Sequence, residues 1–143
     1  MAAPGLFIDA SVLIAAAASP TGGSAAVLEL GRRGHVRLLA SKQVLLEAEH
    51  NIRRKLPSDV LLRFYQYVGT LPLRIVAAPA PEELAQAAEI VAQKDAHVLA
   101  AARKGRADAL LTLDRKHLLA PAVRAASACA IQTPGEFLQG FAG

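Results

Sequence analysis

Short apolar segments alternate along this chain with longer segments in which apolar residues recur at helical spacing. The apolar segments predict strands at residues 5–8, 36–40, 73–78 and 109–113, with a shorter fifth strand at 128–132. The longer segments predict helices over residues 11–18, 24–33, 42–55, 57–68, 81–93 and 95–104, and a last helix that begins near Pro134. Strands and helices therefore alternate along the chain.

The strands at 5–8 and 109–113 are apolar at consecutive positions instead of alternating with polar residues. Such runs are typical of a parallel sheet that helices cover on both faces. We therefore expect an α/β fold, a three-layer α/β/α sandwich with a central parallel sheet of four to five strands, in a single domain over residues 1–143. Gly34 and Gly105 are expected to end helices, and Ser41 is expected to be the N-cap of the next one.

Two of the predicted strands are followed directly by an aspartate. Asp9 follows the strand at 5–8, and Asp114 follows the strand at 109–113. Sites in such sheets form beyond the carboxyl ends of the strands, where two neighbouring carboxylates would repel each other. A divalent cation such as Mg²⁺ or Mn²⁺ would neutralise them, because these ions prefer carboxylate and water oxygens. For Asp9 taken alone, a turn or helix-cap role is an equal alternative.

Two further acids lie in predicted helices, and each has an ordinary structural interpretation. Asp95 opens the helix at 95–104, where a first-turn acid is common. Glu47 lies in the middle of a helix, where an isolated glutamate usually belongs to a solvated face. Glu49 points to a different side of that helix and competes with Glu47 for any role in a site.

Composition and charge narrow the class of protein. The 143 residues carry 16 Lys and Arg against 12 Asp and Glu, a net charge of +4, which fits a polyanionic partner without requiring one. A single cysteine, Cys129, excludes an internal disulfide and a CxxC zinc site. The sequence has no charge-free apolar run of about 18 residues and no basic leader, so we expect a cytoplasmic protein without a membrane span.

The acids lie in segments that resemble the motifs of the PIN-domain family. Residues 7–14, FIDASVLI, resemble the opening motif, in which an apolar strand is followed by Asp, a small residue and then Ser, Thr or Asn. Residues 41–51, SKQVLLEAEHN, resemble the second motif, in which the essential acid follows a helix-starting Ser by six residues. That acid is Glu47 in this chain.

The second half of the chain continues the resemblance. Asp95 and its alanine-rich helix resemble the third motif, and residues 105–118 resemble the strand that ends in Thr-x-Asp, here Thr112 and Asp114. The tail at 131–138, IQTPGEFL, resembles the C-terminal Thr-Pro-x-x-Phe/Leu of the group. The likeness thus covers nearly the whole chain, in order.

This resemblance implies a metal-dependent endoribonuclease, in which acids hold Mg²⁺ or Mn²⁺ and water attacks the phosphodiester. The implied metal ligands and catalytic residues are Asp9, Glu47, Asp95 and Asp114. Glu47 would either bind metal or orient the attacking water. Ser11 and Thr112 would hold carboxylates or metal-bound waters through their hydroxyls. For Thr112, the role of an ordinary strand residue is an equal alternative.

One position departs from the family pattern. Many PIN domains carry a further acid two or three residues after the last aspartate, where this chain has Lys116 and His117. Without this acid, the site would bind one metal tightly and a second only weakly or with the help of the substrate, or the protein would be a degenerate enzyme. Candidate phosphate contacts are Arg53, Arg115 and Lys116, although a solvated basic face explains each of them equally well. For His117 we expect a polar loop role, because no His or Cys lies four residues away.

Two alternatives stay open. The first is a catalytically weak or inactive PIN-like module that binds RNA or a protein partner. The second is a receiver or a haloacid-dehalogenase-like domain, but Asp9-Ala10-Ser11 lacks the second acid of Asp-x-Asp and no lysine convincingly ends a later strand. Within the PIN family, the size suits a VapC-like toxin of a toxin–antitoxin pair. That class implies an RNA substrate and a small antitoxin as partner, and dimerisation is common in the family.

Overall fold

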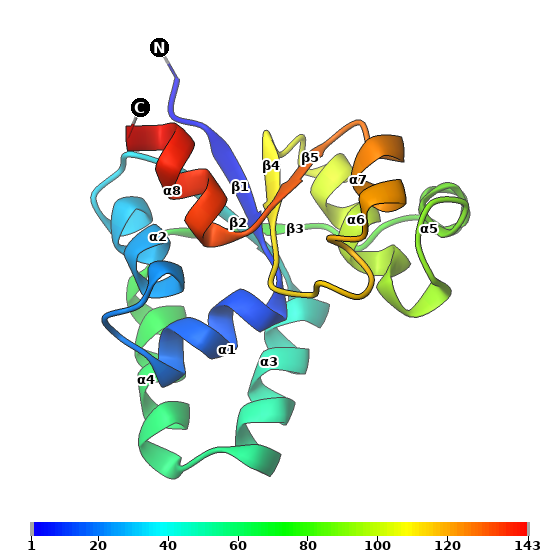
Figure 1. The fold of residues 1–143 in the computed structure, drawn as a ribbon. Coiled ribbons are helices and arrows are strands. Elements are labelled where there is room, and N and C mark those ends of the chain that lie inside the picture. The colour runs from blue at the N-terminus through cyan, green and yellow to red at the C-terminus, as the bar shows by residue number, and fades with distance from the viewer. Residues whose placement is uncertain (1, 143) are drawn as a thin grey trace.

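A central parallel sheet organises the computed structural model, which describes residues 2–142 (Figure 1). The strands are β1 (Gly5–Ile8), β2 (Arg37–Ser41), β3 (Leu73–Val76), β4 (Ala109–Leu111) and β5 (Ala130–Gln132). They form one five-stranded sheet in the order β3-β2-β1-β4-β5, and each adjacent pair is parallel. The expected parallel sheet is confirmed, and β1 and β4 are neighbours at its centre.

Helices cover both faces of this sheet. They are α1 (Ala10–Ala18), α2 (Gly23–Arg32), α3 (Lys42–Lys55), α4 (Ser58–Thr70), α5 (Pro81–Ala88), α6 (Ala96–Lys104), α7 (Pro121–Ala126) and α8 (Pro134–Ala142), with a 3-10 turn, η1 (Gln93–Asp95). In Figure 1, α1, α2, α4 and α8 lie on one side of the sheet and α5, α6 and α7 on the other. The predicted three-layer α/β/α arrangement is therefore confirmed.

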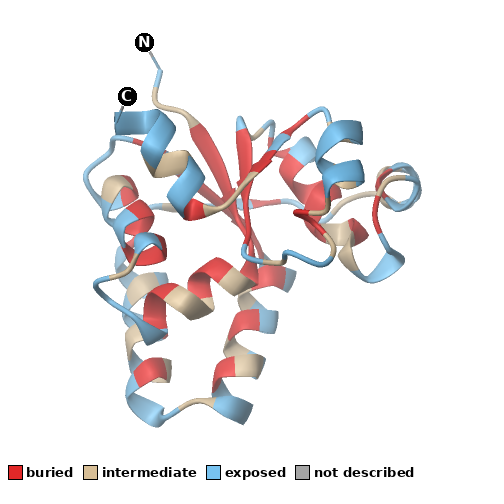
Figure 2. Ribbon diagram, viewed as in Figure 1, coloured by how far each residue is buried: buried red, intermediate tan, exposed pale blue. Residues whose placement is uncertain are grey.

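The sheet is the centre of the hydrophobic core (Figure 2). All four residues of β1 are buried, and so are all three of β4. This burial on both faces explains why their sequences are apolar at consecutive positions. On one face, α2 packs closely on β2, and a Cβ added at Gly31 would overlap the side chain of Leu38. Only glycine lets this helix approach the strand so closely.

Most predicted boundaries agree with the structure, and their local signals work as expected. The Ser41 hydroxyl accepts a hydrogen bond from the Val44 N–H at 3.1 Å and caps α3. Gly34, just after α2, has φ of +81°, a conformation that glycine adopts at little cost.

The helix predicted over residues 81–93 is wrong in its second half, because α5 ends at Ala88. The backbone N–H groups of Glu89 and Ile90 bond to carbonyls three residues earlier, which tightens the chain into a 3-10 turn. The turn buries Val91 and leads into η1, which carries Asp95. The short helix α7 had no counterpart among the predicted elements.

The described part of the chain has no single helix that is long and apolar enough to cross a membrane. The pair α1 and α2 passes such a test only when both helices are taken together, and they meet at an angle of 100°.

Candidate functional site

Asp9 lies at the carboxyl edge of the sheet, directly after β1. Its backbone N–H bonds to the Leu111 carbonyl at 3.1 Å, so the link to β4 continues one residue beyond the strand. Its side chain caps α1 by accepting a hydrogen bond from the Ala10 N–H at 2.8 Å. The residue is only 6% exposed. Asp9 therefore has the cap role that its position suggested, and its second carboxylate oxygen still lies in the site.

Two hydroxyl groups hold that second oxygen. Thr112 Oγ1 donates to Asp9 Oδ2 at 2.7 Å, and Ser11 Oγ donates to the same atom at 3.0 Å. Each hydroxyl in turn accepts a backbone N–H: Thr112 from Asp114 at 3.1 Å, and Ser11 from Leu113 at 3.0 Å. The loop after β4 is thus tied to the start of α1 through Asp9, which fixes the direction of its carboxylate.

Burial is the largest influence on the Asp9 carboxyl and raises its pKa above the usual value. The hydrogen bonds from Thr112, Ser11 and Ala10 act in the opposite direction, and the negative charge of Asp114 adds a smaller increase. The net direction is upward. An ionised Asp9 is therefore costly in the protein unless a positive charge comes to it.

Asp114 and Asp95 approach from two different loops. Asp114 follows β4 and is partly exposed, and its Oδ1 accepts the backbone N–H of His117 at 3.2 Å. Asp95 ends η1 and stands just before α6. Its Oδ2 is completely buried and has no hydrogen-bond partner among the described residues. A buried, unpaired carboxylate oxygen costs folding free energy, so this atom is suited to a cation or a donor that is added later.

The two glutamates of α3 face different surroundings. Glu47 lines the same cavity as the three aspartates, whereas Glu49 accepts a hydrogen bond from the Tyr65 hydroxyl at 2.5 Å and pairs with Arg53 at 3.8 Å. Partial burial raises the pKa of Glu47, and the charges of Asp9 and Asp95 raise it further. Of the two competitors, Glu47 is therefore the one that the structure brings to the aspartates.

The four acids line one cavity of about 310 Å³ at the carboxyl edge of the sheet. Its lining also includes Asn51, Lys94 and His97, which the sequence reasoning did not assign to the site. The sequence contains a signal for two of them. Asn51 is four residues after Glu47 and so shares its helix face, and Lys94 immediately precedes Asp95.

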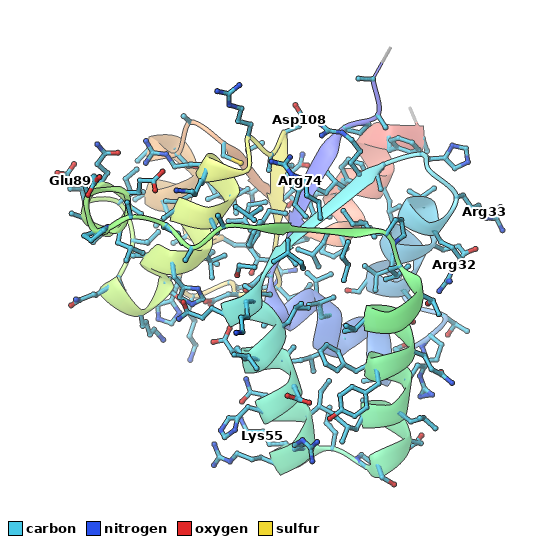
Figure 3. The ribbon with its side chains drawn as sticks, turned by 180° about the vertical axis from the view of Figure 1, so that it is seen from behind. Arg32, Arg33, Lys55, Arg74, Glu89 and Asp108 are labelled. Atoms are coloured by element: carbon cyan, nitrogen blue, oxygen red, sulfur yellow. The ribbon has the colours of Figure 1, made fainter. Side chains whose placement is uncertain are left out.

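The predicted basic residues lie outside this lining. Arg53 donates to the Tyr65 hydroxyl at 2.6 Å, next to its pairing with Glu49. It lies near the end of α3 that is marked by Lys55 in Figure 3, far from the sheet. Arg115 and Lys116 are exposed on the loop after Asp114. Lys94 is the cation that the structure places in the cavity wall.

The donor set suits a hard divalent cation. Carboxylate oxygens are the ligands that Mg²⁺ and Mn²⁺ prefer. The buried, unpaired Oδ2 of Asp95 and the raised pKa values of Asp9 and Glu47 both indicate a deficit of positive charge at this place. The residues present therefore fit a metal ion.

The family model of the PIN domain matches residues 5–116. This chain therefore belongs to the PIN-domain family, and the matched segment contains all four acids of the cavity. No curated protein matches the sequence closely enough to count as a relative.

Solved structures share the fold at low sequence identity. PAE2754 from Pyrobaculum aerophilum is 20% identical with a TM-score of 0.66, over 99% of this chain and 97% of that one. VapBC2 from Rickettsia felis, solved with a fragment of promoter DNA, is 15% identical with a TM-score of 0.65, over 90% and 96%. VapC20 from Mycobacterium tuberculosis, described as a toxin that cleaves the sarcin-ricin loop, is 17% identical with a TM-score of 0.55, over 86% and 96%.

Proposed function

We propose that this chain is an endoribonuclease that hydrolyses phosphodiester bonds of RNA with the help of Mg²⁺ or Mn²⁺. One observation carries the proposal: Asp9, Glu47, Asp95 and Asp114 come from separate elements and line a single cavity. Such a group of like charges is unfavourable by itself. It becomes favourable when a divalent cation and a phosphate bind together.

The three aspartates would hold the cation, and Glu47 would either join them or orient the attacking water. A bound divalent ion lowers the pKa of a coordinated water and offsets negative charge on the phosphoryl oxygens. Ser11 and Thr112 hold the Asp9 carboxylate in one orientation through two hydrogen bonds. Because the pKa of Glu47 is raised, this residue is suited to orient the attacking water and accept its proton.

Phosphate binding would fall to the cations around the cavity. Lys94 lines the cavity. Its positive charge offsets part of the increase in the pKa of Glu47, so it lies within electrostatic reach of the acids. Arg115 and Lys116 are exposed on the adjoining loop, where they would meet the RNA backbone beyond the scissile phosphate. Arg53 is engaged by Tyr65 and Glu49 and would contribute less.

The direct test is cleavage of a labelled, structured RNA by wild-type protein in Mg²⁺, in Mn²⁺ and in chelator. Asp9→Asn and Asp114→Asn should each lower the cleavage rate by about 10²–10³-fold, and the chelator should abolish cleavage. A rate close to that of the wild type in either variant, or cleavage that persists in chelator, would exclude a metal-dependent nuclease. RNA binding without any cleavage would favour the alternative of an inactive RNA-binding module.

A matched pair of variants tests the glutamate. Glu47→Gln should strongly reduce the cleavage rate, and Glu49→Gln on the same helix should leave it close to that of the wild type. Equal rates for the two variants would mean that the helix acid has been assigned to the wrong position.

We further propose that this nuclease is the toxin of a toxin–antitoxin pair. The support is the likeness in fold to VapC20, to VapBC2 and to FitAcB from Neisseria gonorrhoeae. Induced expression should arrest bacterial growth, and co-expression of a small protein encoded immediately upstream should restore it. Growth that is unaffected by an active nuclease would exclude the toxin role. Homodimerisation stays a prediction that sedimentation velocity would test.

A further inference from the structure

His117 lies on the loop that follows β4, three residues after Asp114. Its Nδ1 is 3.1 Å from Asp114 Oδ1 and 3.2 Å from Oδ2. Its backbone N–H donates to Asp114 Oδ1 at 3.2 Å. A local turn therefore holds the ring against the carboxylate of Asp114, which itself lines the cavity with the other acids.

This pair is joined by Asp95 in a group with the spacing of a metal site. One ligand atom from each of Asp95, Asp114 and His117 can be chosen so that all three lie within 4.8 Å of one another. Two atoms bound at right angles to an ion at about 2.1 Å lie about 3.0 Å apart, and two bound on opposite sides lie about 4.2 Å apart. The 3.1 Å between Asp114 Oδ1 and His117 Nδ1 matches two neighbouring positions around one ion, and a carboxylate oxygen of Asp95 lies within 4.8 Å of the other two ligand atoms.

A second observation points to the same place. The Oδ2 of Asp95 is buried without a partner among the described residues. Neither the Asp114–His117 contact nor the turn that forms it explains this free oxygen. A cation shared by the three side chains would satisfy it.

We propose that the imidazole of His117 is a direct ligand of the catalytic metal, together with Asp95 and Asp114. This inference rests on the proposed metal-dependent nuclease and adds a nitrogen ligand to a set of oxygens. Imidazole nitrogen suits transition metals such as Mn²⁺ and Co²⁺ better than it suits Mg²⁺. The chain should therefore favour Mn²⁺ over Mg²⁺ more strongly than an all-carboxylate site would.

The alternative is that His117 has only a structural role. If His117 only hydrogen-bonds Asp114, it positions that carboxylate and does not touch the ion. His97 lines the cavity itself, and its Nδ1 is buried without a partner in the described part of the chain. It lies outside the three-residue group, so it is the natural competitor in a test of nitrogen ligation.

Pulsed electron paramagnetic resonance on the Mn²⁺-loaded protein distinguishes these roles, because a directly bound imidazole gives a ¹⁴N coupling. The coupling should appear in the wild type, in His97→Asn and in the surface control His35→Asn. It should disappear in His117→Asn, with Mn²⁺ still bound about tenfold more weakly. Thermal unfolding in chelator shows whether each variant is folded.

The other outcomes separate this inference from the proposed function. Bound Mn²⁺ that is lost in Asp114→Asn but shows no ¹⁴N coupling in the wild type would overturn the ligand role and leave the metal-dependent nuclease intact. A coupling that disappears in His97→Asn instead would also overturn it. Absence of any Mn²⁺ or Mg²⁺ binding would overturn both proposals.

A ratio of affinities gives an independent measurement. Calorimetric titration with Mn²⁺ and with Mg²⁺ should show that His117→Asp reduces the preference for Mn²⁺ by about tenfold, because a carboxylate replaces the nitrogen. His35→Asp supplies the same change of charge away from the site and should leave the ratio unchanged. An equal ratio in wild type and His117→Asp would contradict the inference.

Discussion

Two aspartates at opposite ends of the central strands meet different electrostatic surroundings. Asp108, just before β4, accepts the Gly5 N–H at 2.6 Å and faces the Arg37 guanidinium at 3.8 Å. Its side chain is 62% exposed. Figure 3 shows it at the amino edge of the sheet. This acid joins β1 to β4, and the protein supplies its counter-ion.

Asp9, at the carboxyl edge, is buried and is held by hydroxyls and one backbone N–H instead of a protein cation. The nearby charge of Asp114 raises its pKa further. The comparison teaches that Asp108, which only joins two strands, is paired with a cation of the protein, whereas Asp9 is held by neutral donors. At the carboxyl edge, Lys94 is in the cavity wall with four acids, so most of the compensating positive charge has to come from outside.

The largest expected effect is on catalysis. Asp9→Asn should lower kcat/KM on RNA by about 10²–10³-fold, because metal binding supplies several kcal/mol of transition-state stabilisation. Asp108→Asn should stay within about twofold of the wild type, since it changes an exposed ion pair far from the cavity. Steady-state kinetics on one labelled RNA would measure both. A comparable loss of kcat/KM in the two variants would contradict the proposal that only the carboxyl edge of the sheet is catalytic.

The next effect is on stability in the presence of metal. Mn²⁺ at about 100 times its dissociation constant should stabilise the fold by about 2.7 kcal/mol, which raises Tm by about 5–10 °C. Asp108→Asn should keep this increase and Asp114→Asn should lose most of it. Differential scanning fluorimetry with metal and with chelator is sufficient. An increase that persists in Asp114→Asn would place the ion elsewhere.

Removal of one hydroxyl tests how Asp9 is held. Thr112→Val should lower the free energy of unfolding by about 1–3 kcal/mol, because it leaves a buried carboxylate and the Asp114 N–H short of a partner. Thr70→Val, at an exposed hydroxyl, is the matched control and should change it by less than about 0.5 kcal/mol. Urea denaturation measures both. Equal changes in the free energy of unfolding for the two variants would mean that the hydrogen bond from Thr112 to Asp9 does not stabilise the site.

The smallest effect contrasts two glutamates. Glu47 has a raised pKa, so its ionised form opposes folding, whereas Glu83 has a pKa lowered by Lys104 and by the Ala80 N–H. In chelator near neutral pH, Glu47→Gln should raise Tm by about 1–2 °C, whereas Glu83→Gln should lower it.

The pH dependence has opposite signs at these two positions. The Glu47 penalty is absent below its unfolded pKa, near 4.5, and grows as pH rises through the higher folded pKa. The Glu83 contribution is present above its unfolded pKa and is lost as pH falls through the lower folded pKa. Both differences from the wild type should therefore shrink in acid. A pH series of melts that kept either difference constant would contradict the assignment.

The sequence was a good guide to the sheet and to part of the helical layers. Residues 5–8 are all apolar because helices cover both faces of the strand. Such a run can be recognised from the sequence of the segment alone. The end of α5 at Ala88 could not be predicted from the sequence, because no glycine or proline lies between Glu82 and Lys104. The chain turns there and buries Val91 against the core, and helix propensity alone does not predict such a turn.

The site was predictable where strand topology determines it. Asp9 and Asp114 follow adjacent strands, so their proximity follows from the sheet order. The different surroundings of Glu47 and Glu49 depend on Tyr65, whose position on α4 is set by tertiary packing. The partner of His117 is a carboxylate three residues earlier, and a search for His or Cys at four residues overlooked it.

The hydrogen bond from the Asp9 N–H to the Leu111 carbonyl has a consequence for amide exchange. It belongs to the buried centre of the sheet, where exchange with solvent requires the rarest openings. The Asp95 N–H bonds to Ala92 in a single turn, which should open far more often. An ion held by both side chains would couple these two segments. Chelation should therefore speed deuterium uptake at η1 far more than at β1.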